Sequence, residues 1–162
     1  MTFRQPNLPS AVLFAAALAS NLAAAQTVPN YGDVYGYFTD DAQYESWYTL
    51  TTQLRRGFDD VCGDTFCEGD YANIQSLGYR CSIEQSSGTI GRCLWLFAGS
   101  YEDIDPATGH FTVTKGFWRC RTPLAPGTTI DALLAALAGD DPLHAPLPGS
   151  SATIYDGLVD CL

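Results

Sequence analysis

Positive charge is scarce in this sequence. Its 162 residues include eight lysines and arginines against 18 aspartates and glutamates, and Lys115 is the only lysine. The net charge of −10 argues against polyanions as partners, because an acidic surface repels nucleic acid and anionic membranes. Solubility outside the cell is the simplest role of this charge. Binding of a cationic protein or ligand is the functional alternative.

Hydrophobic runs long enough to cross a membrane are also missing. The apolar run over residues 11–19 has about half of the ~20 residues that a spanning helix needs. It follows Arg4 and precedes three alanines that end at Ala25, an order typical of a secretory signal peptide. We expect residues 1–25 to be cleaved. The mature chain would then begin at Gln26, carry a net charge of −11 and be secreted or periplasmic, with no membrane contact.

Catalytic motifs are absent as well. The sequence has no G-x-S-x-G nucleophile motif, and its two histidines, His110 and His144, have no partner at the spacing of metal ligands. Its glycines are too scattered to form a phosphate-binding loop. We therefore expect a binding protein rather than an enzyme, and no cofactor.

Cysteines, by contrast, are well represented after the predicted signal peptide. An even number of cysteines behind an export signal predicts paired disulfides. A bridge between Cys62 and Cys67 is sterically allowed, but six cysteines permit many other pairings. The six are Cys62, Cys67, Cys81, Cys93, Cys120 and Cys161.

One long helix is predicted over residues 40–60. Asp40 and Asp41 can accept hydrogen bonds from the free backbone N–H groups at its start, where their charge also suits the helix dipole. Apolar residues then recur at positions 47, 50, 54, 58 and 61, the spacing of one helical face. This pattern predicts a helix that packs on the core of the domain.

Three antiparallel strands are predicted over residues 71–83, 90–101 and 110–121. Residues 86–88 and 105–109 between them are rich in turn-forming side chains and glycine. A further short strand or packed loop is predicted over residues 34–38.

The predicted hairpins also suggest a disulfide. Alignment of the first hairpin about Ser87 places Cys81 opposite Cys93, whereas alignment of the second places Cys93 opposite Cys120. We favour the Cys93–Cys120 bridge, which leaves Cys81 for one of the two earlier cysteines. The first alignment also pairs Leu77 with Phe97 and Tyr79 with Trp95.

The remaining chain completes the predicted architecture. A short helix after Thr128 is followed by an extended Pro-rich surface strap over residues 142–151 and a last strand over residues 152–162. The order predicts an α+β fold: an N-terminal long helix packed on a 3–4-stranded antiparallel sheet, with a short C-terminal helix, stabilised by disulfides. Residues 26–38 form an aromatic-rich lead-in, and residues 39–162 form a single domain.

This order of elements resembles that of cystatin-like and NTF2-like folds. The resemblance covers element order, and it implies a long helix lying across a curved antiparallel sheet. Residues 85–89, Gln-Ser-Ser-Gly-Thr, lack the Val and the final Gly of the Q-x-V-x-G turn that cystatins use against cysteine proteases. The resemblance therefore implies a fold and no activity.

An aromatic group lies near the start of the mature chain. Tyr31, Tyr35, Tyr37 and Phe38 are spaced by glycines. Tyrosine combines a large apolar ring with a polar tip, so an exposed cluster suits recognition of a protein or a glycan at the cell envelope. An inhibitor of a basic enzyme is one form of this hypothesis. The alternative is that these rings close the edge of the core.

An acidic run follows the predicted helix and supports two other hypotheses. Asp60, Asp64, Glu68 and Asp70, together with Asp59, are carboxylates that could bind calcium through oxygen ligands and so stabilise a structural domain. Two of them could instead act as acid and base of a small carboxylate-dependent hydrolase. The simplest alternative is a solvated acidic loop.

Overall fold

The computed structural model describes residues 1–2 and 28–162. The apolar run and the cleavage site of the predicted signal peptide lie outside these residues. Among the described residues, no helix combines the length and apolar character needed to cross a bilayer.

The long helix α1 runs over Asp41–Thr65. Its N-terminus is capped by Asp40, whose side chain accepts a hydrogen bond of 2.9 Å from the backbone N–H of Gln43. The buried face contains Trp47, Leu50, Leu54, Phe58 and Cys62. The predicted helix is confirmed, and it continues five residues beyond the predicted end at residue 60.

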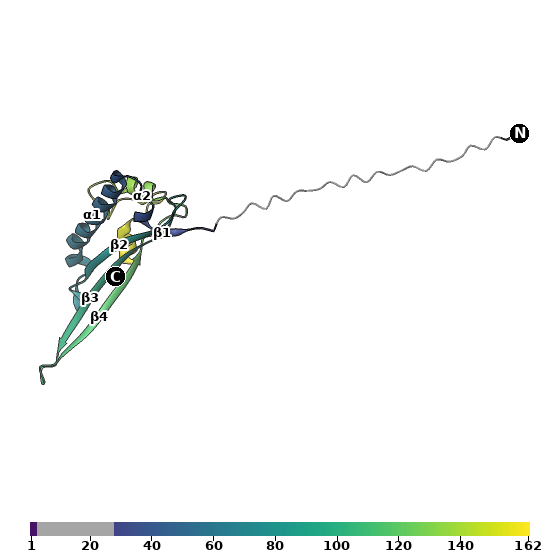
Figure 1. The fold of residues 1–162 in the computed structure, drawn as a ribbon. Helices are drawn as coiled ribbons and strands as arrows, with labels where there is room; N and C mark the ends of the chain where they lie inside the picture. Colours follow the sequence, from purple (N-terminus) through teal and green to yellow (C-terminus); the bar gives the residue numbers. More distant parts are fainter. Residues whose placement is uncertain (3–27) are drawn as a thin grey trace.

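A four-stranded antiparallel sheet with the order β1-β2-β3-β4 forms the second layer (Figure 1). Its strands are β1 at Tyr31–Asp33, β2 at Gln75–Glu84, β3 at Ile90–Ile104 and β4 at Phe111–Arg121. The three predicted main strands are confirmed. Of the two alternatives predicted for residues 34–38, the packed loop is confirmed: β1 ends at Asp33, whose side chain accepts from the backbone N–H of Tyr35 and starts the 3-10 turn Val34–Gly36, and Val34 and Phe38 are buried.

The register of the first hairpin agrees with two of the three predicted pairs. Tyr79 lies opposite Trp95, and Cys81 lies opposite Cys93. The third pair is wrong because an irregularity in β2 between Ser76 and Gly78 places Ser76, rather than Leu77, opposite Phe97.

The disulfides are Cys62–Cys67, Cys81–Cys93 and Cys120–Cys161. The predicted Cys93–Cys120 bridge is wrong because the register of β3 against β4 is shifted by two residues. Cys120 lies opposite Trp95, and the backbone N–H of Thr122 donates to Cys93 at 3.2 Å. Three disulfides are compatible with an extracellular or other oxidising compartment.

The C-terminal segment contains two short helices. Helix α2 spans Ile130–Ala136 and confirms the predicted short helix, and α3 spans Ile154–Val159. The predicted last strand is therefore wrong. A helix forms there instead because Thr153 and Asp156 make a capping box, in which the side chain of each accepts a hydrogen bond from the backbone N–H of the other.

The segment between α2 and α3 is held in the core. It runs through turns, and Leu143 and Leu147 are fully buried. The prediction of an extended surface strap over residues 142–151 is wrong because these two leucines anchor it.

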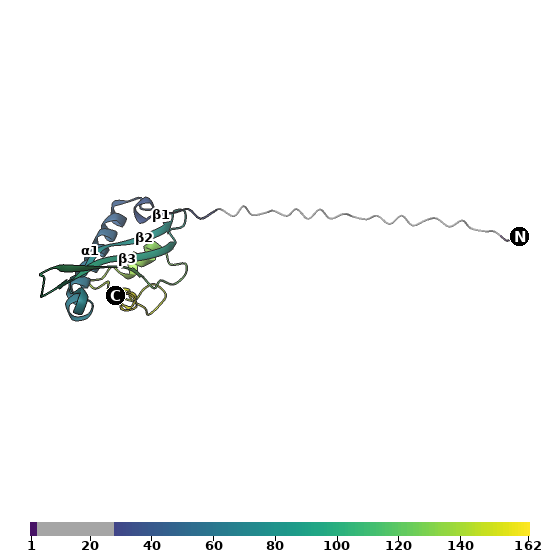
Figure 2. The same cartoon turned by 90° about the horizontal axis from the view of Figure 1, so that it is seen from below.

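The two layers enclose one hydrophobic core. Phe58 of α1 contacts Trp95 and Phe97 of β3, with ring centroids 5.8 and 4.6 Å apart. Aromatic contacts of this kind join the helix to one face of the sheet. The predicted α+β fold is confirmed. The β3–β4 hairpin projects beyond the helices, and we call its outer part, residues 100–117, the arm (Figures 1 and 2).

Candidate functional site

Side chains of the sheet alternate between two faces, and the core uses only one of them. Trp95, Phe97 and Cys120 point to the core and are buried. The residues between them lie on the other side, which we call the open face. The open face contains Tyr31 and Asp33 of β1; Arg80, Ser82 and Glu84 of β2; Arg92, Leu94, Leu96, Ala98, Ser100, Glu102 and Ile104 of β3; and Phe111, Val113, Lys115, Phe117, Arg119 and Arg121 of β4.

Cations are concentrated on the open face of this acidic protein. Seven lysines and arginines follow residue 26, and all but Arg55 and Arg56 lie on this face. The five are Arg80, Arg92, Lys115, Arg119 and Arg121, and all are exposed. Arg80 forms a 2.7 Å salt bridge with Asp33. None of the other four forms a salt bridge with any residue that the structure describes.

The arginines flank a stripe of leucine on the central strand β3. In one row across the sheet, Leu94 lies between Arg80 and Arg121. In the next row Leu96 faces Arg119. Directly opposite residues on paired strands are roughly 5 Å apart, so the guanidinium groups can reach over the edges of the stripe. The open face therefore offers apolar contact between positive charges.

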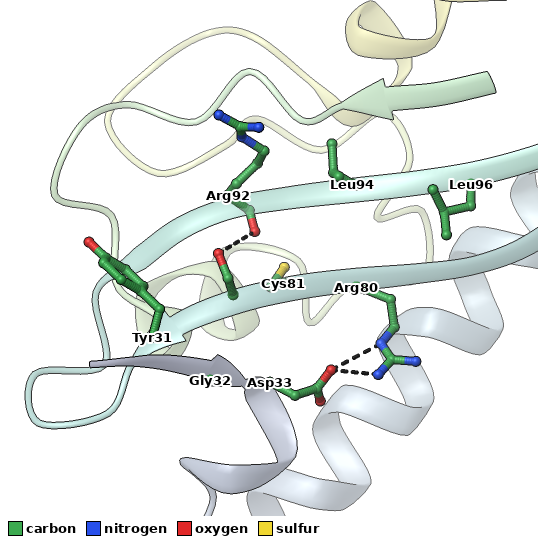
Figure 3. Close-up of a pocket in the computed structure, with 9 residues that line it drawn as sticks. Tyr31, Gly32, Asp33, Arg80, Cys81, Arg92, Leu94 and Leu96 are labelled. Atoms are coloured by element: carbon green, nitrogen blue, oxygen red, sulfur yellow. Dashed lines mark hydrogen bonds and ion pairs between the residues drawn. The ribbon is translucent and has the colours of Figure 1, made fainter. Parts of the chain in front are cut away.

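A hollow of about 460 Å³ lies at the body end of this stripe. Figure 3 shows Leu94 and Leu96 along one strand, with Arg92 and Tyr31 toward one end. The Tyr31 ring lies across Gly91, where a Cβ atom would come within 2.7 Å of a ring carbon. Glycine at this position therefore lets the ring lie close against the strand.

The arm carries apolar side chains on the open face. Ile104, Phe111, Val113 and Phe117 are between 51% and 67% exposed. The Arg119 guanidinium lies 5.2 Å from the centre of the Phe117 ring, a cation–π contact. The opposite side of the arm, which continues the core face, instead carries Tyr101, Asp103, Thr112 and Thr114. The apolar side chains of the arm thus lie on the side away from the protein's own core.

The four predicted aromatic binding residues lie in different surroundings. Tyr31 belongs to the open face, whereas the ring of Tyr35 stacks on that of Tyr44 of α1 at 6.2 Å. Phe38 is 6% exposed and belongs to the core, and Tyr37 packs against the core beside Gly88. The structure does not bring the four rings together into one surface cluster. Their role in binding stays a prediction, and only Tyr31 lies at the open face.

The predicted acidic site is spread over the end of α1 and the following turn. Asp59, Asp60 and Asp64 are exposed on the helix, and Glu68 follows it; the side chain of Asp70 lies outside the description. Within the described part of the chain, no three carboxylate, histidine or cysteine groups are placed to hold a metal ion.

Asp60 does line a second hollow, of about 400 Å³, with Asp141 and His144. The Nδ1 atom of His144 lies 3.0 Å from the Asp141 carboxylate, and both side chains are about half exposed or more. The side chains that line this hollow include no serine, threonine or cysteine that a histidine could activate. The arrangement resembles a surface ion pair more than a catalytic dyad.

Sequence reasoning missed the cationic residues of the open face. A signal was present: from Phe111 to Arg121, every second residue is apolar or basic, which is the period of one strand face. Arg80 and Arg92 could not be added from sequence, because only the register brings them beside this strand.

The fold and the site together define a small, disulfide-linked α+β domain with one open, cationic and apolar sheet face. Comparison of the chain with models of protein families, with curated proteins and with solved structures found no match.

Proposed function

We propose that the protein is an exported, non-enzymatic binding module that uses the open face of its sheet to bind a partner. One observation carries the proposal: the uncovered side of the sheet combines half-exposed Phe111, Val113 and Phe117 with arginines. The solvent side of an antiparallel sheet is ordinarily polar. Contiguous exposed apolar side chains rimmed by polar ones are typical of interaction surfaces.

The local charge of the open face favours an anionic group on the partner. The net charge of the whole chain, −10, would favour a cationic partner. The open face, however, is locally positive, because it carries five of the lysines and arginines. Arginine forms paired hydrogen bonds with planar anions such as carboxylates. A cationic partner, such as a basic enzyme, would instead have to contact the acidic surface elsewhere.

Export is supported by the cysteines. All six are paired, and disulfides of this number form in oxidising compartments. A secreted or periplasmic location is thus part of the proposal, together with a partner in the same compartment.

Site-specific photocrosslinking tests the binding face. A photoreactive benzoylphenylalanine replaces Phe117 on the open face or, as a control, Tyr48, which is 72% exposed on α1. In cells that produce the protein, we expect a defined adduct from position 117 and none from position 48. The double substitution Arg119→Glu/Arg121→Glu should abolish that adduct. Equal crosslinking from both positions, or none from position 117, contradicts the proposal.

The hydrolase and calcium hypotheses remain separate predictions with simple tests. A hydrolase that uses the acidic run loses turnover in Asp64→Asn or Glu68→Gln while the fold stays intact. A calcium-stabilised domain shows a melting temperature that rises with calcium and falls with chelator.

A further inference from the structure

We infer that the partner is a polypeptide that carries carboxylates along one side and at one end of an apolar stripe. This inference rests on the proposed binding function and names the chemistry of the ligand. The first argument is the order of groups across the sheet. Arg121 and Arg119 of β4 lie beside Leu94 and Leu96, and Arg92 precedes these leucines on β3, so a complementary segment needs an apolar centre with carboxylates along one side and at one end.

The arginines differ in how available they are. Arg80 already pairs with Asp33 at 2.7 Å, whereas Arg92, Arg119 and Arg121 have no carboxylate partner among the described residues. Each of these three guanidinium groups can donate two hydrogen bonds to one carboxylate of the partner. Most of the electrostatic recognition therefore comes from these three residues.

The length of the site is the second argument. From Arg92 to Ile104, β3 covers roughly 40 Å, at the strand rise of about 3.3 Å per residue. The arginines lie at the end of β3 nearest the core. Beyond Lys115, the open face of the arm has two cross-strand pairs, Glu102 with Val113 and Ile104 with Phe111. A matching partner is elongated, with carboxylates near Arg92 and Arg121 and large apolar side chains near Ile104 and Phe111.

The acidic groups around the site favour a narrow polypeptide over a broad polyanion. Glu84 and Glu102 lie on the open face at its two ends, and Asp103 lies close to the tip of the arm. An anionic bilayer or a nucleic acid would place phosphates against these carboxylates, and the net charge of −10 adds to the repulsion. A polypeptide can instead place its carboxylates at the arginines alone.

A designed peptide tests this inference. The probe is a fluorescent amphipathic helix of ~27 residues, the number that spans about 40 Å at 1.5 Å per residue. Along one half, glutamates line one side and the end of its apolar stripe; along the other half, the stripe consists of phenylalanine and leucine. Two control peptides have the same composition in shuffled order, or lysine in place of glutamate. Binding is measured by fluorescence anisotropy at low salt and again with added salt.

We expect the designed peptide to bind in the micromolar range and both controls to bind at least about tenfold more weakly. The double substitution Arg119→Glu/Arg121→Glu should weaken binding by about tenfold or more. Arg55→Glu/Arg56→Glu makes the same charge change on α1 and serves as the matched control, with an effect below about twofold. Phe117→Ser should weaken binding without any change of charge. Circular dichroism confirms that each variant folds.

Several outcomes overturn the inference. One is equal binding of the shuffled peptide, and another is equal loss in the two double variants, which would indicate non-specific attraction. Tighter binding of phosphatidylglycerol vesicles, oligothymidine or polygalacturonate, lost in Arg119→Glu/Arg121→Glu, overturns the polypeptide and leaves the proposed binding face intact. If no probe binds and photocrosslinking at position 117 also yields no adduct, the proposed function fails together with the inference.

Discussion

Tyr79 and Thr122 form a polar pair inside the core. Both residues are about 95% buried, and their hydroxyl groups share a hydrogen bond of 2.9 Å. Burial raises the pKa of Tyr79 well above its ordinary value, because the charged phenolate would lose its hydration. Tyr79 therefore stays neutral in the folded protein, and its hydroxyl group provides the hydrogen-bond partner of the buried Thr122 hydroxyl.

Removal of one partner of this pair should destabilise the fold. In Tyr79→Phe the buried Thr122 hydroxyl loses its partner, and we expect the free energy of unfolding to fall by ~1–3 kcal/mol. The double variant Tyr79→Phe/Thr122→Val removes both polar groups and should recover part of this loss. Urea unfolding of the three proteins measures the effect. A Tyr79→Phe protein as stable as the parent would show that the hydrogen bond contributes nothing.

Glu84, in the turn between β2 and β3, makes the stability of the fold depend on pH in the acidic range. Hydrogen bonds from Ser87 and Ser86 lower the pKa of Glu84 from 4.5 to about 2. The ionised carboxylate is favoured in the folded state, so its contribution to stability is present above pH 4.5 and is lost as the pH falls toward 2. We expect Glu84→Gln to flatten the stability profile within this window. Unfolding by urea at several pH values tests this, with Ser87→Ala expected to give a smaller change in the same direction.

At the scale of the elements, the disulfides differ in which segments they connect and in how much chain they enclose. Cys120–Cys161 joins the edge strand β4 to the chain end after α3 and closes a separation of 41 residues, whereas Cys62–Cys67 spans only five. A longer loop loses more conformational freedom when it is closed. Replacement of Cys120 and Cys161 by serine should cost about 4 kcal/mol, against about 2 kcal/mol for Cys62 and Cys67.

This difference is measured by urea unfolding of the two double serine variants. Increased hydrogen exchange in α3 should accompany the loss of the Cys120–Cys161 bridge, because a helix of six residues is not stable alone and would then be held by its buried residues Ile154 and Leu158 only. Equal destabilisation by the two pairs of substitutions contradicts this assignment of roles.

The arm gives the sheet a surface that the core does not need. Along β3, the residues next to α1 are buried aromatics, while those of the arm lie beyond the helices (Figure 1). Apolar side chains there add nothing to the free energy of folding through the core, because they stay half exposed. Their presence is better explained by burial against a partner.

At the scale of the whole molecule, the protein combines a disulfide-linked domain with an uneven distribution of charge. If it is exported as we propose, mass spectrometry of the mature protein should find a chain that begins at Gln26 and contains no free thiol. Thiol titration of the native material provides the second measurement. A chain that retains Arg4, or that shows six free thiols, contradicts export and the compartment inferred from it.

Local patterns were sufficient to predict the main elements. The apolar positions 47, 50, 54 and 58 identified α1 because a helix repeats every 3.6 residues, and the residues around Gly88 and Gly109 identified the two main hairpins. The predicted last strand is wrong because Thr153 and Asp156 form a capping box that starts a helix there, although Asp is not the usual last residue of this motif.

The sequence by itself determined the long helix, the three main strands and the short helix after Thr128, together with the even number of cysteines and a strongly acidic composition. Only the tertiary structure decided which cysteines are joined and where the positive charge lies. The physical reason is register. A shift of two residues between β3 and β4 moves Cys120 from Cys93 to Trp95. The same pairing brings Arg80 and Arg121, forty-one positions apart in sequence, to either side of Leu94.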